Sequence, residues 1–504
     1  MKDAKKRFNR SSGILMPIYS LPSPYGIGTL GQKAYEFVDF LKHSGQTYWQ
    51  MLPMGHTGFG NSPYQTYSSV AGNPLFIDLD KLVDMKLLTN EDLADADMDL
   101  ESFKSRVDYE RVIPIKMSLL KQAFKNAKEL EKPINIFVEN NIDWLPDYAL
   151  FMAIKEMYNG KPIWEWDDRE LIKRNPEKME FYSSKLKEDI QFHYFTQYLF
   201  FTQWAYLKDY ANRNGIQIIG DIPIYPSPDS ADVWANQKLF KVDEICRPNG
   251  IAGVPPDIYS ETGQLWGNPT YDWNIHEKTN FEWWIWRIRN TLDLADVIRI
   301  DHFRAFQDYW EVPQGETTAI NGKWLPGPGI KFFDVLKYTL GDIPIIAEDL
   351  GIITDEVREL LAETGYPGMR VMIFGLNENE DNIHLPHNWP VNCVGYTSTH
   401  DSETFAQAVC EKNFQNRIFA EDYINYTSTI DTSLGMCGVR TALASPASLV
   451  IIPIQDVLSI GQEGRMNVPS TIGGNWEWRL TESELSSSTI TYKLFQITKT
   501  YKRI

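Results

Sequence analysis

The chain has 504 residues, with 49 Lys or Arg and 67 Asp or Glu, so its formal net charge is −18. This charge argues against a nucleic-acid partner, because phosphate backbones are repelled by it. Hydrophobic residues make up 43% of the chain, yet the longest apolar runs are strand-sized, which predicts a globular protein without a membrane span. Four scattered cysteines and the lack of a signal-peptide core predict a reduced, cytoplasmic protein.

Eight short apolar runs predict the strands. The runs are 48–52, 75–79, 216–220, 297–300, 343–347, 369–373, 393–397 and 449–452. They are nearly continuous rather than alternating, which is typical of strands buried on both faces of a parallel sheet. Helical patterns lie between several of them, at 32–43, 192–212 and 354–363. Eight buried strands with helical connections predict an α/β fold, the (β/α)₈ or TIM barrel.

Two long segments interrupt this pattern. Residues 84–190 are charged and helical in pattern, which predicts an inserted, mainly helical subdomain between the first barrel strands (1–83) and the remainder of the barrel (191–504). Residues 226–275 are rich in Pro, Gly, Asn and Asp with interleaved Trp, which predicts an ordered active-site loop insertion. Little chain remains after the last strand, so we expect no separate C-terminal β-domain.

Carboxylates follow four of the predicted strands. Asp221 ends the third strand, Asp301 the fourth, Glu348 the fifth, and the pair His400-Asp401 the seventh. The catalytic groups of a barrel sit at the C-terminal ends of its strands, so we expect these side chains to converge at one mouth.

Converging carboxylates suit the chemistry of glycosidic bonds. One ionised carboxylate attacks the anomeric carbon, and a second with a raised pKa protonates the leaving oxygen. Arg299 lies two residues before Asp301 and so points to the same face, where it would keep that carboxylate ionised as the nucleophile. Glu348 would be the acid/base, and His400 and Asp401 would bind sugar hydroxyls. The aromatic fraction of 13% adds a weak hint of a sugar-binding groove.

Other interpretations of these residues stay open. A single Asp after a strand is most often a helix cap or a turn residue. Asp, Glu and His also build divalent-cation sites, although neither His-x-His nor His-Glu-x-x-His occurs, so we expect no metal. Gly461–Gly464 and Gly473-Gly474 are candidates for a phosphate-binding loop, but their acidic and aromatic neighbours fit a sugar better.

Several blocks, spread over nearly the whole chain, resemble one family. They are 22–28, 58–65 (Gly-Phe-Gly-Asn-Ser-Pro-Tyr-Gln), 253–257 (Gly-Val-Pro-Pro-Asp), 263–269 (Gly-Gln-Leu-Trp-Gly-Asn-Pro), 299–304 (Arg-Ile-Asp-His-Phe-Arg) and 475–479 (Asn-Trp-Glu-Trp-Arg). They resemble the 4-α-glucanotransferases, also called amylomaltases or disproportionating enzymes (glycoside hydrolase family 77), which are related to the α-amylase clan.

The resemblance implies roles for individual residues. It makes Asp301 the nucleophile of a covalent β-glucosyl-enzyme, Glu348 the general acid/base and Asp401 the stabiliser of the transition state. The substrate-binding residues that it implies are Tyr64, Asp221, Asp257, Gln264, Trp266, Arg299, His302, His400 and Asn475. Among these, the loop with Asp257, Gln264 and Trp266 would cover the donor and help to place the acceptor.

The implied reaction is the retaining transfer of an α-1,4-glucan segment from a donor maltodextrin to the 4-hydroxyl of glucose or another glucan, without a cofactor. An α-amylase-type hydrolase on the same barrel is the nearest alternative, because it differs only in whether water or a sugar takes the intermediate. A non-catalytic glucan-binding protein is the alternative from another class.

Overall fold

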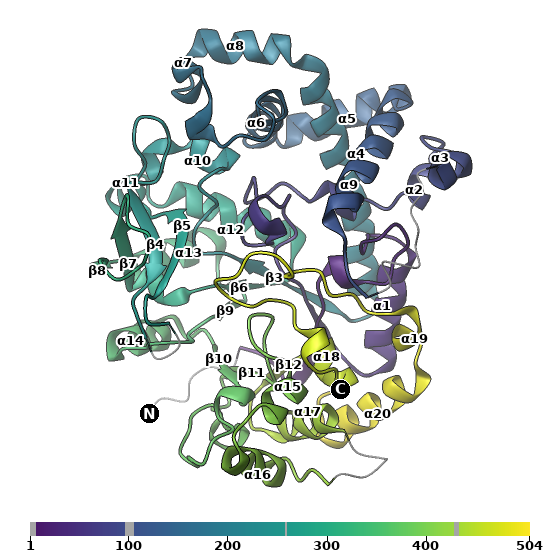
Figure 1. Ribbon diagram of the computed structural model, residues 1–504, viewed down its shortest axis with the longest axis vertical. Coiled ribbons are helices and arrows are strands. Elements are labelled where there is room, and N and C mark those ends of the chain that lie inside the picture. Colours follow the sequence, from purple (N-terminus) through teal and green to yellow (C-terminus); the bar gives the residue numbers. More distant parts are fainter. Residues whose placement is uncertain (1–6, 96–104, 258–259, 428–432) are drawn as a thin grey trace.

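The computed structural model describes residues 7–95, 105–257, 260–427 and 433–504. Eight parallel strands close a barrel in the order β1-β12-β11-β10-β9-β6-β3-β2 (Figure 1). The barrel strands are β1 (Ser11–Leu15), β2 (Tyr48–Gln50), β3 (Gln217–Ile222), β6 (Val297–Ile300), β9 (Ile345–Ala347), β10 (Gly368–Val371), β11 (Cys393–Tyr396) and β12 (Leu449–Pro453). Helices run between these strands, so the predicted (β/α)₈ barrel is confirmed.

One predicted strand is wrong, and one barrel strand was missed. The run 75–79 is no strand, because Pro74–Phe76 forms a 3₁₀ helix that the side chain of Asn73 caps by accepting from the Leu75 amide. The missed strand is β1, whose small residues hid it from an apolar pattern. Its Gly13 packs so tightly on β2 that an added Cβ would lie 2.5 Å from the Cβ of Tyr48.

A group of helices separates β2 from β3. They are α2 (Asp80–Asp84), α3 (Asn90–Asp95), α4 (Tyr109–Lys125), α5 (Glu131–Asn140), α6 (Leu145–Met157), α7 (Arg169–Ile172), α8 (Pro176–Lys185) and α9 (Lys187–Arg213). Figure 1 shows α6, α7 and α8 at the upper end, away from the barrel strands. Helix α9 is about 40 Å long and packs on α6 and on barrel helix α1 (Gln32–His43), so it joins both regions. The division of the chain at residues 84 and 190 stays a prediction.

A second sheet lies outside the barrel. It is antiparallel in the order β5-β4-β7-β8, with β4 (Gly250–Val254), β5 (Gln264–Pro269), β7 (Asp308–Pro313) and β8 (Lys323–Pro326). The first two strands come from the predicted loop insertion at 226–275, which also contains α10 (Ala231–Ala235). The other two come from the segment after β6, where the half-exposed, charged sequence gave no strand signal. Long-range pairing therefore turns two loops into one sheet.

The remaining helices complete the barrel. They are α11 (Trp273–Lys278), α12 (Glu282–Leu294), α13 (Ile330–Leu340), α14 (Asp355–Thr364), α15 (Phe405–Cys410), α16 (Phe414–Tyr423), α17 (Leu434–Ala444), α18 (Ile454–Leu458), α19 (Glu482–Leu485) and α20 (Ser488–Thr500). After β12 the described residues of the chain form helices and loops and no further named strand. In the same described part, no helix is both long and apolar enough to cross a membrane.

Candidate active site

A buried arginine joins the carboxylates at the ends of β3 and β6. Arg299 is 3% exposed and pairs across the sheet with Asp221. Its Nη1 donates to both oxygens of Asp221 at 2.7 Å, and its Nη2 donates to Oδ1 of Asp301 at 2.8 Å. Burial of a charge is costly unless it is paired, and here one guanidinium serves two carboxylates. Asp301 is the more accessible of the two, with a side chain that is 28% exposed.

Glu348 follows β9 directly, and backbone amides fix both of its oxygens. The amide of His302 donates to Oε2 and the amide of Leu350 to Oε1, each at 2.7 Å. His302 has φ 52° and ψ 51°, a left-handed conformation that turns its amide toward this carboxylate. Burial raises the pKa of Glu348 to about 7, and the neighbouring Asp301 carboxylate adds to this rise. Glu348 can therefore hold a proton near neutral pH.

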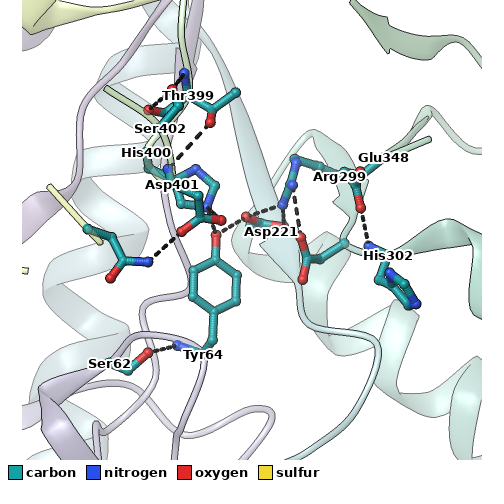
Figure 2. A network of polar contacts seen from close by, with 12 residues as sticks. Ser62, Tyr64, Asp221, Arg299, His302, Glu348, Thr399, His400, Asp401 and Ser402 are labelled. Atoms are coloured by element: carbon teal, nitrogen blue, oxygen red, sulfur yellow. Dashed lines mark hydrogen bonds and ion pairs between the residues drawn. The ribbon is translucent and has the colours of Figure 1, made fainter. Parts of the chain in front are cut away.

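Tyr64 links the residues at the ends of β3 and β6 to the loop that follows β11. Its hydroxyl donates to Oδ2 of Asp221 at 2.7 Å and lies 2.6 Å from Nε2 of His400. The same nitrogen lies 3.1 Å from Oδ2 of Asp401. Figure 2 shows Tyr64 between the His400–Asp401 pair and the Asp221–Arg299 pair. One hydrogen-bonded network therefore spans the mouth of the barrel.

Asp401 has the opposite electrostatic setting from Glu348. Its side chain is 45% exposed, and Nδ2 of Asn467 donates to its Oδ1 at 2.7 Å. Burial acts to raise the pKa of Asp401, but His400 and the hydrogen bonds outweigh it and lower this pKa to about 2. Burial acts to lower the pKa of His400, but the Asp401 carboxylate acts to raise it, and the net result is a raised pKa. Asp401 is thus an anion at every working pH.

The second sheet reaches the site through Trp266 on β5. The ring of Trp266 meets the ring of His302 edge-on, with centroids 4.9 Å apart, and its Nε1 donates to Oε1 of Gln264 at 3.2 Å. Gln65, beside Tyr64, donates to Asn268 on the same strand at 3.0 Å. These contacts fix the sheet against the residues that follow β6 and β2.

The other two predicted residues make contacts within their own loops. Asp257 lies between β4 and β5, where its Oδ1 accepts from the Ser260 amide at 2.8 Å. Asn475 binds the Val468 amide and donates to Thr471. Its neighbour Trp476 is the residue whose ring approaches Tyr64, with centroids 5.9 Å apart.

Sequence reasoning missed Asn467 and Trp476 as parts of the site. Asn467 stands between the two candidate phosphate loops, Gly461–Gly464 and Gly473-Gly474, and Trp476 stands in a family-like block. Their place in the loop after the last barrel strand is the signal that the sequence offers for them. The resemblance implies that His302 binds substrate, and in the structure its backbone amide donates to Glu348.

The arrangement favours acid/base and nucleophilic chemistry at a sugar. Across the described residues, no group of three or more His, Cys, Asp or Glu side chains is arranged to hold a metal ion. The acids contact Arg299, backbone amides and His400 instead. A carboxyl group with a pKa of about 7 beside an ion-paired carboxylate is the combination that glycosidic bond cleavage needs.

Comparisons with known proteins agree with this chemistry. A family model described as 4-alpha-glucanotransferase matches residues 16–485. The 4-alpha-glucanotransferase of Clostridium butyricum is 44% identical, covering 97% of this chain and all of the relative, and that of Streptococcus pneumoniae is 44% identical, covering 98% of both. A solved structure of amylomaltase from Streptococcus agalactiae in complex with acarbose superposes with a TM-score of 0.94 at 42% identity, covering 98% of this chain and 99% of that one. The chain belongs to the 4-alpha-glucanotransferase family.

Proposed function

We propose that this protein transfers segments of α-1,4-glucan from a donor maltodextrin to the 4-hydroxyl of glucose or of another glucan. The observation that carries the proposal is the pairing of Glu348, whose pKa is raised to about 7, with Asp301, whose Oδ1 accepts a hydrogen bond from the Arg299 guanidinium. The acarbose complex of the amylomaltase relative supports a carbohydrate at this mouth.

In the first step Asp301 attacks the anomeric carbon of the donor. Because Oδ1 accepts from Arg299, we assign Oδ2 as the attacking oxygen. The glycosidic bond breaks as the new bond forms, and Glu348 gives its proton to the leaving oxygen. The products are a shortened glucan and a covalent β-glycosyl-enzyme, with Glu348 now ionised.

In the second step the acceptor reverses this sequence. Ionised Glu348 takes the proton of the acceptor 4-hydroxyl, whose oxygen attacks the anomeric carbon and displaces Asp301. Two inversions at one carbon give net retention, so the new bond is again α-1,4. Both carboxyl groups return to their starting states, and the cycle uses no cofactor.

Asp401 and its neighbours act on the sugar that carries the developing positive charge. An anion with a pKa of about 2 stabilises an oxocarbenium-like transition state, and His400 keeps it in place. Tyr64, Asp221 and Arg299 form the floor on which this sugar rests. The raised pKa of Asp221, due to burial, is opposed by Arg299, which favours its ionised form.

The second sheet favours transfer over hydrolysis. Trp266 lies against His302, directly after the nucleophile, where an aromatic face can stack on an acceptor sugar and exclude water from the intermediate. Gln264, bound to the Trp266 indole, and Asp257 and Asn475 on neighbouring loops would add polar contacts to the glucan.

Incubation with maltotriose followed by chromatography tests the proposal. A transferase yields glucose together with a ladder of longer maltodextrins, whereas an α-amylase-type hydrolase yields only shorter sugars. A protein that binds maltotriose and leaves it unchanged would be a non-catalytic glucan-binding protein.

We place this activity in the cytoplasm. All four cysteines, Cys246, Cys393, Cys410 and Cys437, are free thiols, which supports a reducing compartment.

A further inference from the structure

Asp456 is a buried carboxylate outside the mechanism above. It lies in α18, directly after β12, and is 0% exposed. Its Oδ2 accepts the hydroxyls of Thr397 and Ser398, both at 2.6 Å, and its Oδ1 accepts the backbone amide of Phe405 at 2.7 Å. Burial raises the pKa of Asp456 to about 6, and the groups that oppose this rise are those two hydroxyls and that amide. A carboxylate buried among neutral donors is costly to keep, so its three bonds need an explanation.

These bonds reach both ends of the segment that carries Asp401. Thr397 and Ser398 follow β11 directly, and Phe405 is the first residue of α15. Residues 397–405 thus form a loop, and both of its ends bind the side chain of Asp456, which follows the next barrel strand, β12. His400 and Asp401 lie between the two anchored ends.

The middle of the loop is held by a local turn and by side chains of other loops. The hydroxyl of Ser402 accepts the Thr399 amide at 2.9 Å, which closes a local turn around His400 and Asp401. The Asp401 side chain contacts Asn467 and His400. His400 also contacts the Tyr64 hydroxyl, and Glu403 forms an ion pair with Arg465. These partners stand on loops themselves, whereas Asp456 binds the two ends of the loop to α18, directly after barrel strand β12.

We propose that Asp456 is a positioning residue of the transfer reaction, which sets the place of Asp401 and His400 by binding both ends of loop 397–405. This inference rests on the proposed function, because it requires Asp401 to act on the reacting sugar. A displacement of about 1 Å at a catalytic group can lower a rate by roughly 10²-fold, so an anchor of this kind affects turnover without touching substrate.

The test measures Asp456→Ala and Asp456→Asn in the wild-type and in the Asp401→Asn background. Fluoride release from an α-maltosyl fluoride donor follows low rates, and transfer from maltotriose is measured in parallel. In the wild-type background we expect Asp456→Ala to lower kcat roughly 10- to 100-fold with little change in KM. Asp456→Asn keeps an acceptor for the Phe405 amide and should recover most of that loss.

The Asp401→Asn background separates positioning from stability. Because Asp456 acts through Asp401, we expect Asp456→Ala to lower the rate there by less than about threefold. Asp78→Ala is the matched control. Asp78 lies just before α2, is 3% exposed, and accepts from the Thr29 hydroxyl and the Lys81 amide. Loss of its carboxylate should therefore lower Tm while kcat stays unchanged.

An equal loss in both backgrounds, or an unchanged kcat in a folded Asp456→Ala protein, would overturn the inference. If Asp456→Ala does not fold, Ser398→Ala removes one anchoring hydroxyl and should lower kcat roughly three- to tenfold, and an unchanged kcat overturns the inference equally. Failure of the proposed function is a separate result, since it appears as a wild-type protein that makes no longer glucans from maltotriose.

Discussion

The acids at the barrel mouth are held in two different ways. Asp301 and Glu348 follow β6 and β9 directly, and Arg299 and backbone amides fix their oxygens. Asp401 lies five residues beyond β11, has a side chain that is 45% exposed, and is held by Asn467 of another loop and by its neighbour His400. The first pair therefore shares the rigidity of the sheet, whereas the third acid depends on contacts between loops.

The difference matches the tasks that we propose for these residues. Bond making and proton transfer need atoms placed to within a fraction of an ångström, which strand ends and backbone donors supply. Stabilisation of charge on the sugar acts over a longer distance and tolerates a loop, provided that the loop is anchored.

The largest effect is expected from Asp301→Asn. An amide cannot form the covalent intermediate, so kcat should fall by about 10⁴-fold or more, while glucan binding stays measurable. Turnover of maltotriose and calorimetric titration with acarbose check the two parts. A verified variant that keeps more than about a tenth of the wild-type rate would remove Asp301 from its role.

Asp401→Asn should cost less, roughly 10²- to 10³-fold in kcat, with little change in KM, because it removes one electrostatic stabiliser and leaves the bond-making pair intact. Initial rates over a range of maltotriose concentrations separate kcat from KM. A loss as large as that of Asp301→Asn would contradict the contrast between loop and strand-end acids.

Glu348→Gln should abolish transfer and stabilise the fold in a pH-dependent way. The folded pKa of Glu348 is about 7 against an ordinary value of 4.5, so the folded state binds more protons than the unfolded state within this window. The wild type thus loses stability relative to the variant as pH rises from 4.5 to 7. The difference in free energy of unfolding should grow by roughly 2–3 kcal/mol across the window.

Denaturant unfolding of both proteins at pH 5 and pH 8 measures this difference. Contributions of groups that do not interact with Glu348 cancel in the comparison of variant with wild type. If the difference in free energy of unfolding between the variant and the wild type stays constant or shrinks toward pH 8, Glu348 is not the proton-holding carboxyl group of the pair.

The smallest effect is expected from Trp266→Ala. Loss of stacking on the acceptor is worth about 1–2 kcal/mol, which shifts the ratio of transfer to hydrolysis by roughly five- to thirtyfold toward water. On maltotriose the variant should release more reducing ends per glucose transferred. An unchanged ratio in a protein of wild-type Tm would make Trp266 a packing residue.

The sequence alone indicated the barrel architecture and the carboxylates that the structure brings together at its mouth. Seven of the eight predicted strands are barrel strands, because continuous apolar runs reflect burial on both faces. The two-residue spacing of Arg299 and Asp301 placed both on one face, and their bond follows from it. These features are local, and local patterns of residues record them directly.

Only the tertiary structure decided which apolar run was a strand and what holds the acids. Strand β1 is identified as a strand only by its pairing with β2 and β12. The run after Asn73 forms a capped 3₁₀ turn instead of a strand, and its carbonyls at Leu75 and Ile77 accept from the buried Lys116. The second sheet and the contacts of Asp456 join segments distant in sequence. Such pairings depend on three-dimensional closure, so no periodicity along the chain records them.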